Sequence, residues 1–161
     1  MKSSDQFHVG IVVEDIDAAA AELSAVFGYQ WAEPLGGPVR VSLPGGGGDE
    51  GEGDDVVLDL LSTYSMSTPR LELVRRVPGT LWEPVTGSGV HHLGYWSDDV
   101  AADSAELARR GHTVEAVGRR PDGTPYWAFH HSRSGPRVEL VTRALQPVLE
   151  QYWATGKRPG A

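Results

Sequence analysis

The pattern of apolar and polar positions predicts a short series of elements in the first half of the chain. Residues 8–13 read HVGIVV, an apolar and β-branched run that is typical of a strand. The next apolar residues recur with the i, i+3/4, i+7 spacing of a helix, which Asp15 or Asp17 is placed to cap and Gly28 to end. Three further strands are expected at residues 39–43, 56–61 and 70–75.

The same series recurs in the second half. A strand is expected at residues 91–96 and a helix at about 100–110, with Gly111 after it. Strands are then expected at residues 113–117, 126–130 and 137–142. The order is therefore β-α-β-β-β, twice. A last amphipathic helix is expected after Arg143, with Pro147 in its first turn, where proline is tolerated.

Residue identities support a duplication. HVGIVVEDI from His8 matches HLGYWSDDV from His92 at an offset of 84, and PRLELV at 69–74 matches PRVELV at 136–141 at an offset of 67. The first copy is therefore longer by 17 residues. The segment GGGGDEGEGDD at 45–55 accounts for most of this excess. We expect it to be a mobile loop rather than a calcium loop, because its acidic spacing does not match an EF-hand.

These boundaries divide the chain into four parts. They are a first module at 1–77 with the insertion at 45–55, a linker at 78–89 that is rich in Pro and Gly, a second module at 90–143, and a C-terminal helix and tail at 144–161.

Side chains alternate in direction along a strand, and this places four ionisable residues on related faces. Val9, Ile11 and Val13 form the fully apolar face of the first strand, which should meet the helix and leave His8 on the other face. His92 follows the same rule in the second copy. If the apolar neighbours of Glu72 and Glu139 take the core face, both carboxylates point the same way as the histidines.

A carboxylate in the middle of an apolar strand needs a partner, because a lone buried charge is costly. Each copy supplies one imidazole and one carboxylate, so a pseudo-twofold axis would bring His8, Glu72, His92 and Glu139 to one point. Such a mixed N/O set suits Zn, Ni, Co, Fe or Mn. The simpler alternative is that Glu72 and Glu139 pair with Arg70 and Arg137. The recurrence of both residue types at both matching positions favours the metal.

The motifs FHVGIVVEDI, HHLGYWSDDV, RLELV and RVELV resemble the vicinal-oxygen-chelate superfamily, which includes glyoxalase I, methylmalonyl-CoA epimerase, extradiol dioxygenases and bleomycin-resistance proteins. The resemblance covers about residues 7–143. It implies an α+β fold of two tandem βαβββ modules, whose mixed sheets form a metal-binding cup, followed by a short C-terminal helix. It also implies that His8, Glu72, His92 and Glu139 are the ligands of a divalent ion.

A complete His/Glu/His/Glu set is similar to glyoxalase I and the epimerases. The resemblance therefore implies a lyase, isomerase or epimerase that transfers a proton next to a metal-chelated carbonyl, through an enediolate or enolate. Glu139 is the first choice for the base and Glu72 its counterpart, although the sequence does not separate them. Two alternative functions stay open. One is a non-catalytic protein that sequesters an antibiotic-like molecule, and four tryptophans would suit such an aromatic ligand. The other is an extradiol-type dioxygenase, in which one of the two glutamates does not bind the metal. The four tryptophans are Trp31, Trp82, Trp96 and Trp127.

Four further residues are candidates for substrate contact. Trp96 shares the direction of His92 and is a possible aromatic wall. His130 faces the cup if Trp127 and Phe129 belong to the core. Arg70 and Arg137 are placed to hold a substrate carboxylate or to neutralise the glutamates. The remaining histidine of the motif, His91, should point away from the cup and act structurally. The four candidates for substrate contact are therefore Arg70, Trp96, His130 and Arg137.

The composition of the chain limits the classes of binding partner that we expect. The net charge of −8 and the sequence pI near 5.1 exclude the basic surface that nucleic acid or an anionic membrane needs, and weigh mildly against coenzyme A. Cysteine is absent, no apolar run approaches the ~20 residues of a membrane span, and the N-terminus lacks a signal-peptide pattern. We therefore expect a cytoplasmic protein with a small-molecule substrate. The resemblance alone implies a homodimer.

Overall fold

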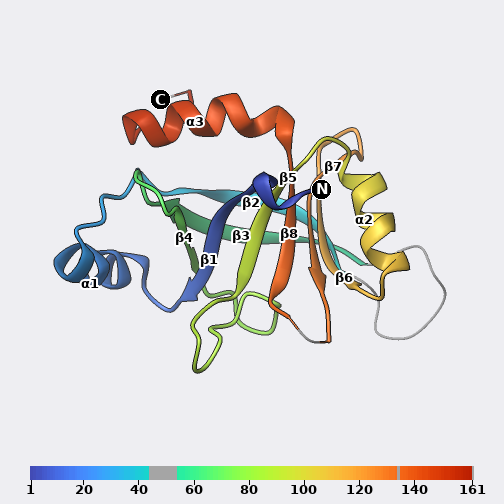
Figure 1. The fold of residues 1–161 in the computed structure, drawn as a ribbon, viewed down its shortest axis with the longest axis horizontal. Helices are drawn as coiled ribbons and strands as arrows, with labels where there is room; N and C mark the ends of the chain where they lie inside the picture. Colours follow the sequence, from blue (N-terminus) through green and yellow to red (C-terminus); the bar gives the residue numbers. More distant parts are fainter. Residues whose placement is uncertain (44–53, 134, 161) are drawn as a thin grey trace.

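The computed structural model describes residues 1–43, 54–133 and 135–160 (Figure 1). Two successive βαβββ units are followed by a C-terminal helix, as expected. The elements are η1 (Ser3–Asp5), β1 (Gln6–Val13), α1 (Ile16–Phe27), β2 (Leu35–Leu43), β3 (Asp54–Tyr64), β4 (Leu71–Arg75), β5 (His92–Ser97), α2 (Val100–Arg109), β6 (Thr113–Arg119), β7 (Pro125–His131), β8 (Arg137–Thr142), η2 (Arg143–Leu145) and α3 (Gln146–Thr155).

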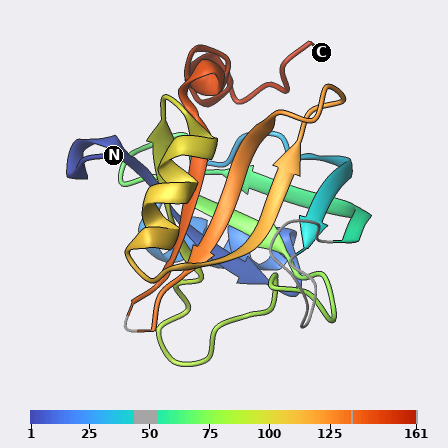
Figure 2. The same cartoon turned by 90° about the vertical axis from the view of Figure 1, so that its right-hand side faces the viewer.

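The eight strands close into one barrel in the order β1-β4-β3-β2-β6-β7-β8-β5. Two antiparallel pairings, β1 with β5 and β2 with β6, join the modules, and the pairs β1–β4 and β5–β8 are parallel. Helices α1 and α2 lie outside the barrel on opposite sides, and α3 crosses one end of it (Figures 1 and 2). The expected fold class, α+β with mixed sheets forming a cup, is confirmed.

The helix ends agree with the signals in the sequence. The Asp15 carboxylate accepts a hydrogen bond from the Ala18 backbone N–H at 3.0 Å, so Asp15 rather than Asp17 is the cap. Gly28 ends α1 in the left-handed conformation, with φ of 76°. Pro147 lies in the first turn of α3, as expected.

Strands β2 and β3 are longer than the sequence pattern indicated. They pair continuously from Leu35 opposite Ser62 to Leu43 opposite Asp54. Asp54 and Asp55 therefore begin β3 and are not part of a loop, which corrects that end of the expected insertion. The other residues of the insertion, 45–53, lie outside the described part of the chain, so the expectation of a mobile loop is not tested there.

The apolar core is divided between the inside of the barrel and the space under α2. The larger cluster is inside the barrel and includes Val12, Val74, Trp96, Trp127 and Val141. The smaller cluster packs beneath α2 and consists of Val100, Leu107, Ala128 and Leu140. In β1, the residues that alternate with the expected core face are the buried ones, because they point into the barrel. His8 is among these buried residues, on the face that alternates with Val9, Ile11 and Val13, as expected.

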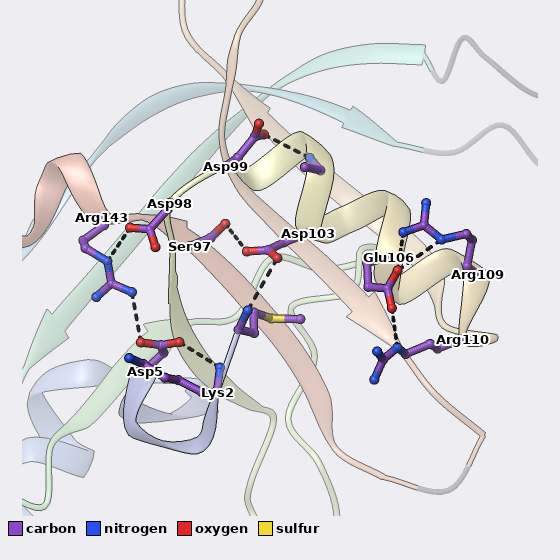
Figure 3. A network of polar contacts seen from close by, with 12 residues as sticks. Lys2, Asp5, Ser97, Asp98, Asp99, Asp103, Glu106, Arg109, Arg110 and Arg143 are labelled. Atoms are coloured by element: carbon purple, nitrogen blue, oxygen red, sulfur yellow. Dashed lines mark hydrogen bonds and ion pairs between the residues drawn. The ribbon is translucent and has the colours of Figure 1, made fainter.

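Polar contacts fix the ends of the chain against the barrel. The Arg143 guanidinium donates to Asp98 at 2.6 Å and to Asp5 at 2.9 Å, which ties the segment before α3 to η1 and to the start of α2 (Figure 3). The Tyr152 hydroxyl of α3 donates to the Glu33 carbonyl at 2.6 Å. Helix α3 is thereby held over the end of the barrel.

Among the described residues, no helix has the length and apolar character that crossing a membrane requires.

Candidate metal centre

Four adjacent strands, in the order β4-β1-β5-β8, carry two matching rows of residues. In one row, Gly10 of β1 pairs with Glu72 of β4 on one side and with His92 of β5 on the other. In the second row, Gly94 of β5 pairs with Glu139 of β8 and with His8 of β1. The two rows exchange under the pseudo-twofold relation of the modules. Each row therefore contributes one imidazole and one carboxylate to the inside of the barrel.

The structure brings the four expected ligands together. Each of His8, Glu72, His92 and Glu139 is buried, and one ligand atom of each lies within 4.8 Å of the others. The Nε2 atoms of His8 and His92 are 2.9 Å apart. His8 Nε2 lies 3.2 Å from Glu139 Oε2, and His92 Nε2 lies 3.1 Å from Glu72 Oε2. The ligand atoms thus converge from both modules on one point.

Glycine is required at the centre of each row. A Cβ placed on Gly10 would lie 1.9 Å from Cε1 of His92, and one placed on Gly94 would lie 1.9 Å from Cε1 of His8. Each imidazole therefore occupies the space that a side chain on the neighbouring strand would fill. This explains in physical terms why the sequence repeats His-x-Gly at both positions.

His91 fixes which nitrogen of His92 carries the proton. His91 Nε2 lies 2.8 Å from the Leu81 carbonyl, so this nitrogen must be the donor. Burial first, and then the neighbouring His92, lower the pKa of His91 to about 4, so its ring is neutral and its Nδ1 is an acceptor. Nδ1 of His91 lies 2.9 Å from Nδ1 of His92, which must therefore donate. Nε2 of His92 is left with a free lone pair aimed at the centre, as a metal ligand needs.

The electrostatics of the cluster fit a cation. Burial disfavours the charged form of His8, but hydrogen bonds to Glu139 and Glu72 outweigh it and raise the pKa to about 9. Burial likewise opposes ionisation of Glu72, but the interactions with His8 and then with His92 outweigh it and hold its pKa well below the usual range. Oε2 of Glu139 is buried, and it contacts His8 Nε2 at 3.2 Å. A divalent ion would satisfy this oxygen and neutralise the two buried carboxylates.

The cluster opens into a cavity of about 340 Å³ inside the barrel. Glu72 and Glu139 lie on its wall, and Leu145 and Leu149, from the segment that crosses the end of the barrel, also line it. The other lining residues except Ser62 are apolar or aromatic, and three of the lining residues, Ser62, Tyr64 and Tyr126, carry a hydroxyl group. The arrangement is that of a small-molecule site, largely apolar with a few convergent polar groups.

A sequence comparison identifies the family. The profile of the Glyoxalase/Bleomycin resistance protein/Dioxygenase superfamily matches residues 7–126. The chain belongs to this superfamily. No curated protein sequence matches.

Solved structures share the superfamily fold at low identity. A variant of methylmalonyl-CoA epimerase from Streptomyces coelicolor, in complex with 2-nitronate-propionyl-CoA, is 19% identical over 87% of this chain and 97% of its own, with a TM-score of 0.56. Methylmalonyl-CoA epimerase from Mycobacterium tuberculosis is 15% identical over 92% and 96%, with a TM-score of 0.55. A variant of 4-hydroxymandelate synthase from Streptomyces coelicolor is 20% identical over 86% of this chain and 38% of its own, with a TM-score of 0.52. The neighbours are thus enzymes of the superfamily, and the likeness concerns the fold.

The residues expected to contact substrate lie outside the cavity wall. The Arg137 guanidinium pairs with Glu115 at 2.6 Å and not with Glu139. The Arg70 guanidinium lies 3.9 Å over the Trp153 ring and bonds the Ser65 carbonyl, and so it does not neutralise Glu72. The expectation that these arginines pair with the glutamates is wrong for both.

Trp96 and His130 also have other environments. Trp96 is buried against Phe7, with ring centroids 3.8 Å apart in a stacked arrangement, and packs in the barrel core. His130 shares a hydrogen bond of 2.7 Å with Ser104 of α2. The expectation that His130 faces the cup is wrong, because the wide barrel interior takes Trp127 and Phe129 and the narrow space under α2 takes Ala128.

Tyr64 of the cavity wall was missed by sequence reasoning, and no signal in the sequence singled it out. Burial together with the charges of Glu72 and Glu139 raises its pKa well above 10, so its hydroxyl stays protonated. Trp82 was one of the four tryptophans that the sequence offered for an aromatic ligand. It comes from the linker, is only 2% exposed, lines the cavity and packs on Trp127 and Phe129.

Proposed function

We propose that the protein is a divalent-metal-dependent enzyme that moves a proton at a carbon next to a carbonyl, as a lyase, isomerase or epimerase of glyoxalase type does. The observation that carries the proposal is the buried set of two imidazoles and two carboxylates at the closed side of an apolar cavity. Four ligands from side chains suit a Zn, Ni, Co, Fe or Mn ion.

The ligand residues have distinct roles in this proposal. His8 and His92 hold the ion through Nε2, and Glu72 and Glu139 hold it through carboxylate oxygens. A bound ion would act as a Lewis acid that polarises the substrate carbonyl and stabilises the negative charge that develops on its oxygen.

Glu139 is the better candidate for the base. Its carboxylate lines the cavity, and Oε2 contacts His8 Nε2 at 3.2 Å, which leaves other lone pairs of the carboxylate available for a substrate proton. Glu72 lies across the pseudo-twofold axis and also borders the cavity, from which it would return the proton on the opposite face. The apolar wall supports this chemistry, because exclusion of water strengthens the interactions of the carboxylates with the reacting atoms.

Hydrogen–deuterium exchange tests the proposal directly. Protein loaded with Co(II), Ni(II), Zn(II) or Mn(II) is incubated in D₂O with 2-hydroxy ketones, with hemithioacetals of 2-oxo aldehydes and with acyl thioesters, and loss of the proton next to the carbonyl is followed by ¹H NMR. We expect metal-dependent exchange in at least one substrate class. Glu139→Gln should slow it by about 100-fold or more.

Two controls accompany the exchange experiment. Glu106→Gln, on the exposed face of α2, should leave exchange unchanged. Metal content is measured for each variant, so that loss of the ion is distinguished from loss of the base. Failure to bind any divalent ion, or exchange that survives both Glu139→Gln and Glu72→Gln, would overturn the proposal.

The aromatic wall favours a second candidate, a protein that sequesters an apolar molecule without turnover. Trp82, Trp127 and Phe129 line the cavity together. Against it stands the cost of burying four ionisable groups in a pocket with no chemical task. Tight ligand binding in the presence of EDTA, without any exchange, would favour this candidate.

A further inference from the structure

We infer that the cavity selects a small, uncharged substrate whose aromatic or similarly bulky apolar group packs against Trp82 and Trp127, and that it rejects carboxylates and coenzyme A thioesters. This inference rests on the proposed function, because it assumes that the oxygens of the substrate face the metal centre.

The first support is the charge of the cavity wall. Among the described residues, the wall carries two carboxylates, Glu72 and Glu139, and no lysine, arginine or histidine. A carboxylate or phosphate placed against the wall away from the ion would lose its hydration and gain no cationic partner, which is strongly unfavourable. The Streptomyces coelicolor epimerase of the same fold binds 2-nitronate-propionyl-CoA, so this wall would distinguish the present protein from it.

The second support is that the cations of the described residues are largely engaged elsewhere. Arg76, for example, forms ion pairs with Glu14 and Glu83. The residues 44–53, which the structure does not describe, contain no lysine or arginine in the sequence. Nine of the fourteen lysines and arginines are paired with a carboxylate, and none of the fourteen lines the cavity, so the wall has no cation to receive the three phosphate groups of coenzyme A. The remaining acid-paired cations are Arg40, Arg75, Arg109, Arg110, Arg137, Arg143, Lys157 and Arg158.

The third support is the aromatic side of the cavity. The rings of Trp82, Trp127 and Phe129 meet edge to face, with centroids 5.6 to 6.1 Å apart, so each ring is held in place by the other two. Phe129 in turn packs edge to face on His92 at 5.0 Å. The aromatic wall thus begins beside a metal ligand, and a flat apolar group attached to the chelating oxygens would lie against it.

The fourth support is the aliphatic part of the cavity wall. It is formed by Leu35, Val39 and Leu60 from β2 and β3, together with Leu145 and Leu149. Burying an apolar group against the aromatic and aliphatic parts of the wall stabilises binding by roughly 25 cal/mol per Å² of area removed from water. A methyl group gains much less than a phenyl group here, so size as well as charge should be selected.

Hydroxamates test the inference, because they chelate a metal through two vicinal oxygens and do not need to react. The probes are acetohydroxamate, benzohydroxamate and 4-carboxybenzohydroxamate, which differ in size and then in charge. Affinities for the Co(II)-loaded protein are measured by tryptophan fluorescence and by the visible spectrum of Co(II). We expect benzohydroxamate to bind at least tenfold tighter than either of the other probes, and millimolar propionyl-CoA not to displace it.

Two variants locate the selectivity. Trp82→Leu should weaken the binding of benzohydroxamate and leave the affinity for acetohydroxamate unchanged. Leu149→Arg, on the half-buried face of α3, places a cation in the wall and should reverse the preference, so that 4-carboxybenzohydroxamate binds tighter than benzohydroxamate. Val148→Arg on the exposed face of the same helix is the matched control and should change neither affinity.

The outcomes separate this inference from the proposed function. Equal affinities for the three probes, tighter binding of the carboxylated probe to the unaltered protein, displacement by propionyl-CoA, or Co(II) binding without benzohydroxamate binding would overturn the selectivity while the metal centre stands. Absence of Co(II) binding would overturn the proposed function, and the inference with it.

Discussion

The imidazole of His92 occupies the space above the Cα atom of Gly10. The two residues pair directly across β1 and β5, and a Cβ on Gly10 would lie 1.9 to 2.3 Å from three atoms of the ring. Gly94 stands in the same relation to His8. The histidines therefore reach the centre only because the neighbouring strand has no side chain at that position. The candidate metal centre therefore depends on two glycines that supply no ligand themselves.

Gly10→Ala should displace His92 and abolish the centre while the barrel still folds. The new methyl group overlaps a ring that is packed on all sides, so the ring must move, at a cost of about 1–3 kcal/mol in folding stability. We expect Co(II) affinity to fall by at least 100-fold, measured by spectroscopic titration, and the far-UV circular dichroism spectrum to remain unchanged. Gly94→Ala should have the same effect through His8.

Gly135→Ala is the control for these substitutions. A Cβ on Gly135 meets only the Ser132 hydroxyl at 3.3 Å, which is the end of a flexible side chain in the β7–β8 connection. Its Co(II) affinity should equal that of the unaltered protein. Retention of full affinity in Gly10→Ala would show that His92 does not need the position found here.

His91→Phe should weaken metal binding without removing a ligand. The chain of hydrogen bonds from the Leu81 carbonyl through His91 to Nδ1 of His92 keeps the proton off Nε2. Loss of such a supporting partner typically costs 10- to 100-fold in metal affinity. His91→Gln, whose amide donates at one end and accepts at the other, should recover part of the affinity. Equal affinity for both variants and the unaltered protein would contradict the role of His91.

Much of the centre could be predicted from the sequence because its geometry follows from strand alternation and duplication. His8, Glu72, His92 and Glu139 are fixed by their positions on the first and last strands of each module, and the structure places them together. The prediction failed for β7, because the sequence does not show which side of a strand has more space for large side chains. His130 was expected to face the cup on the condition that Trp127 and Phe129 belong to the core on the other side of β7, but both of these residues line the cavity inside the barrel, and the space under α2 takes Ala128.

Long-range contacts were also beyond the sequence pattern. Trp82 lies in the linker, and its burial against β7 depends on how the two modules close. The partners of Arg137 and Arg70, Glu115 and Trp153, lie on elements far along the chain or across the barrel. Spacing along one strand placed each arginine two residues from a glutamate, but alternation does not say which charge the flexible side chain reaches.

Arg143→Met should lower the melting temperature of the protein. Arg143 forms ion pairs with both Asp5 and Asp98 (Figure 3). Its hydrogen bond is the main cause that lowers the pKa of Asp5, so its loss leaves the Asp5 carboxylate with fewer partners. Arg109→Met, which removes exposed pairing with Glu106 on α2, is the matched control and should have little effect, because exposed ion pairs contribute little. Thermal unfolding followed by circular dichroism compares the two, and equal melting temperatures would contradict the bridging role of Arg143.

His130 should make the protein less stable as the pH falls from about 6.5 to about 4. Burial first, and then the nearby His112, lower the pKa of folded His130 from 6.5 to about 4. In this interval the unfolded chain binds a proton that the folded chain does not, so the free energy of unfolding decreases with falling pH, and above pH 6.5 the contribution is complete. The effect is of order 2 kcal/mol. His130→Gln should flatten the pH dependence of the free energy of unfolding, measured with urea in the presence of EDTA. The control His131→Gln, at the exposed end of β7, should leave this pH dependence unchanged. The same pH dependence in His130→Gln and in the unaltered protein would show that His130 is not the group responsible.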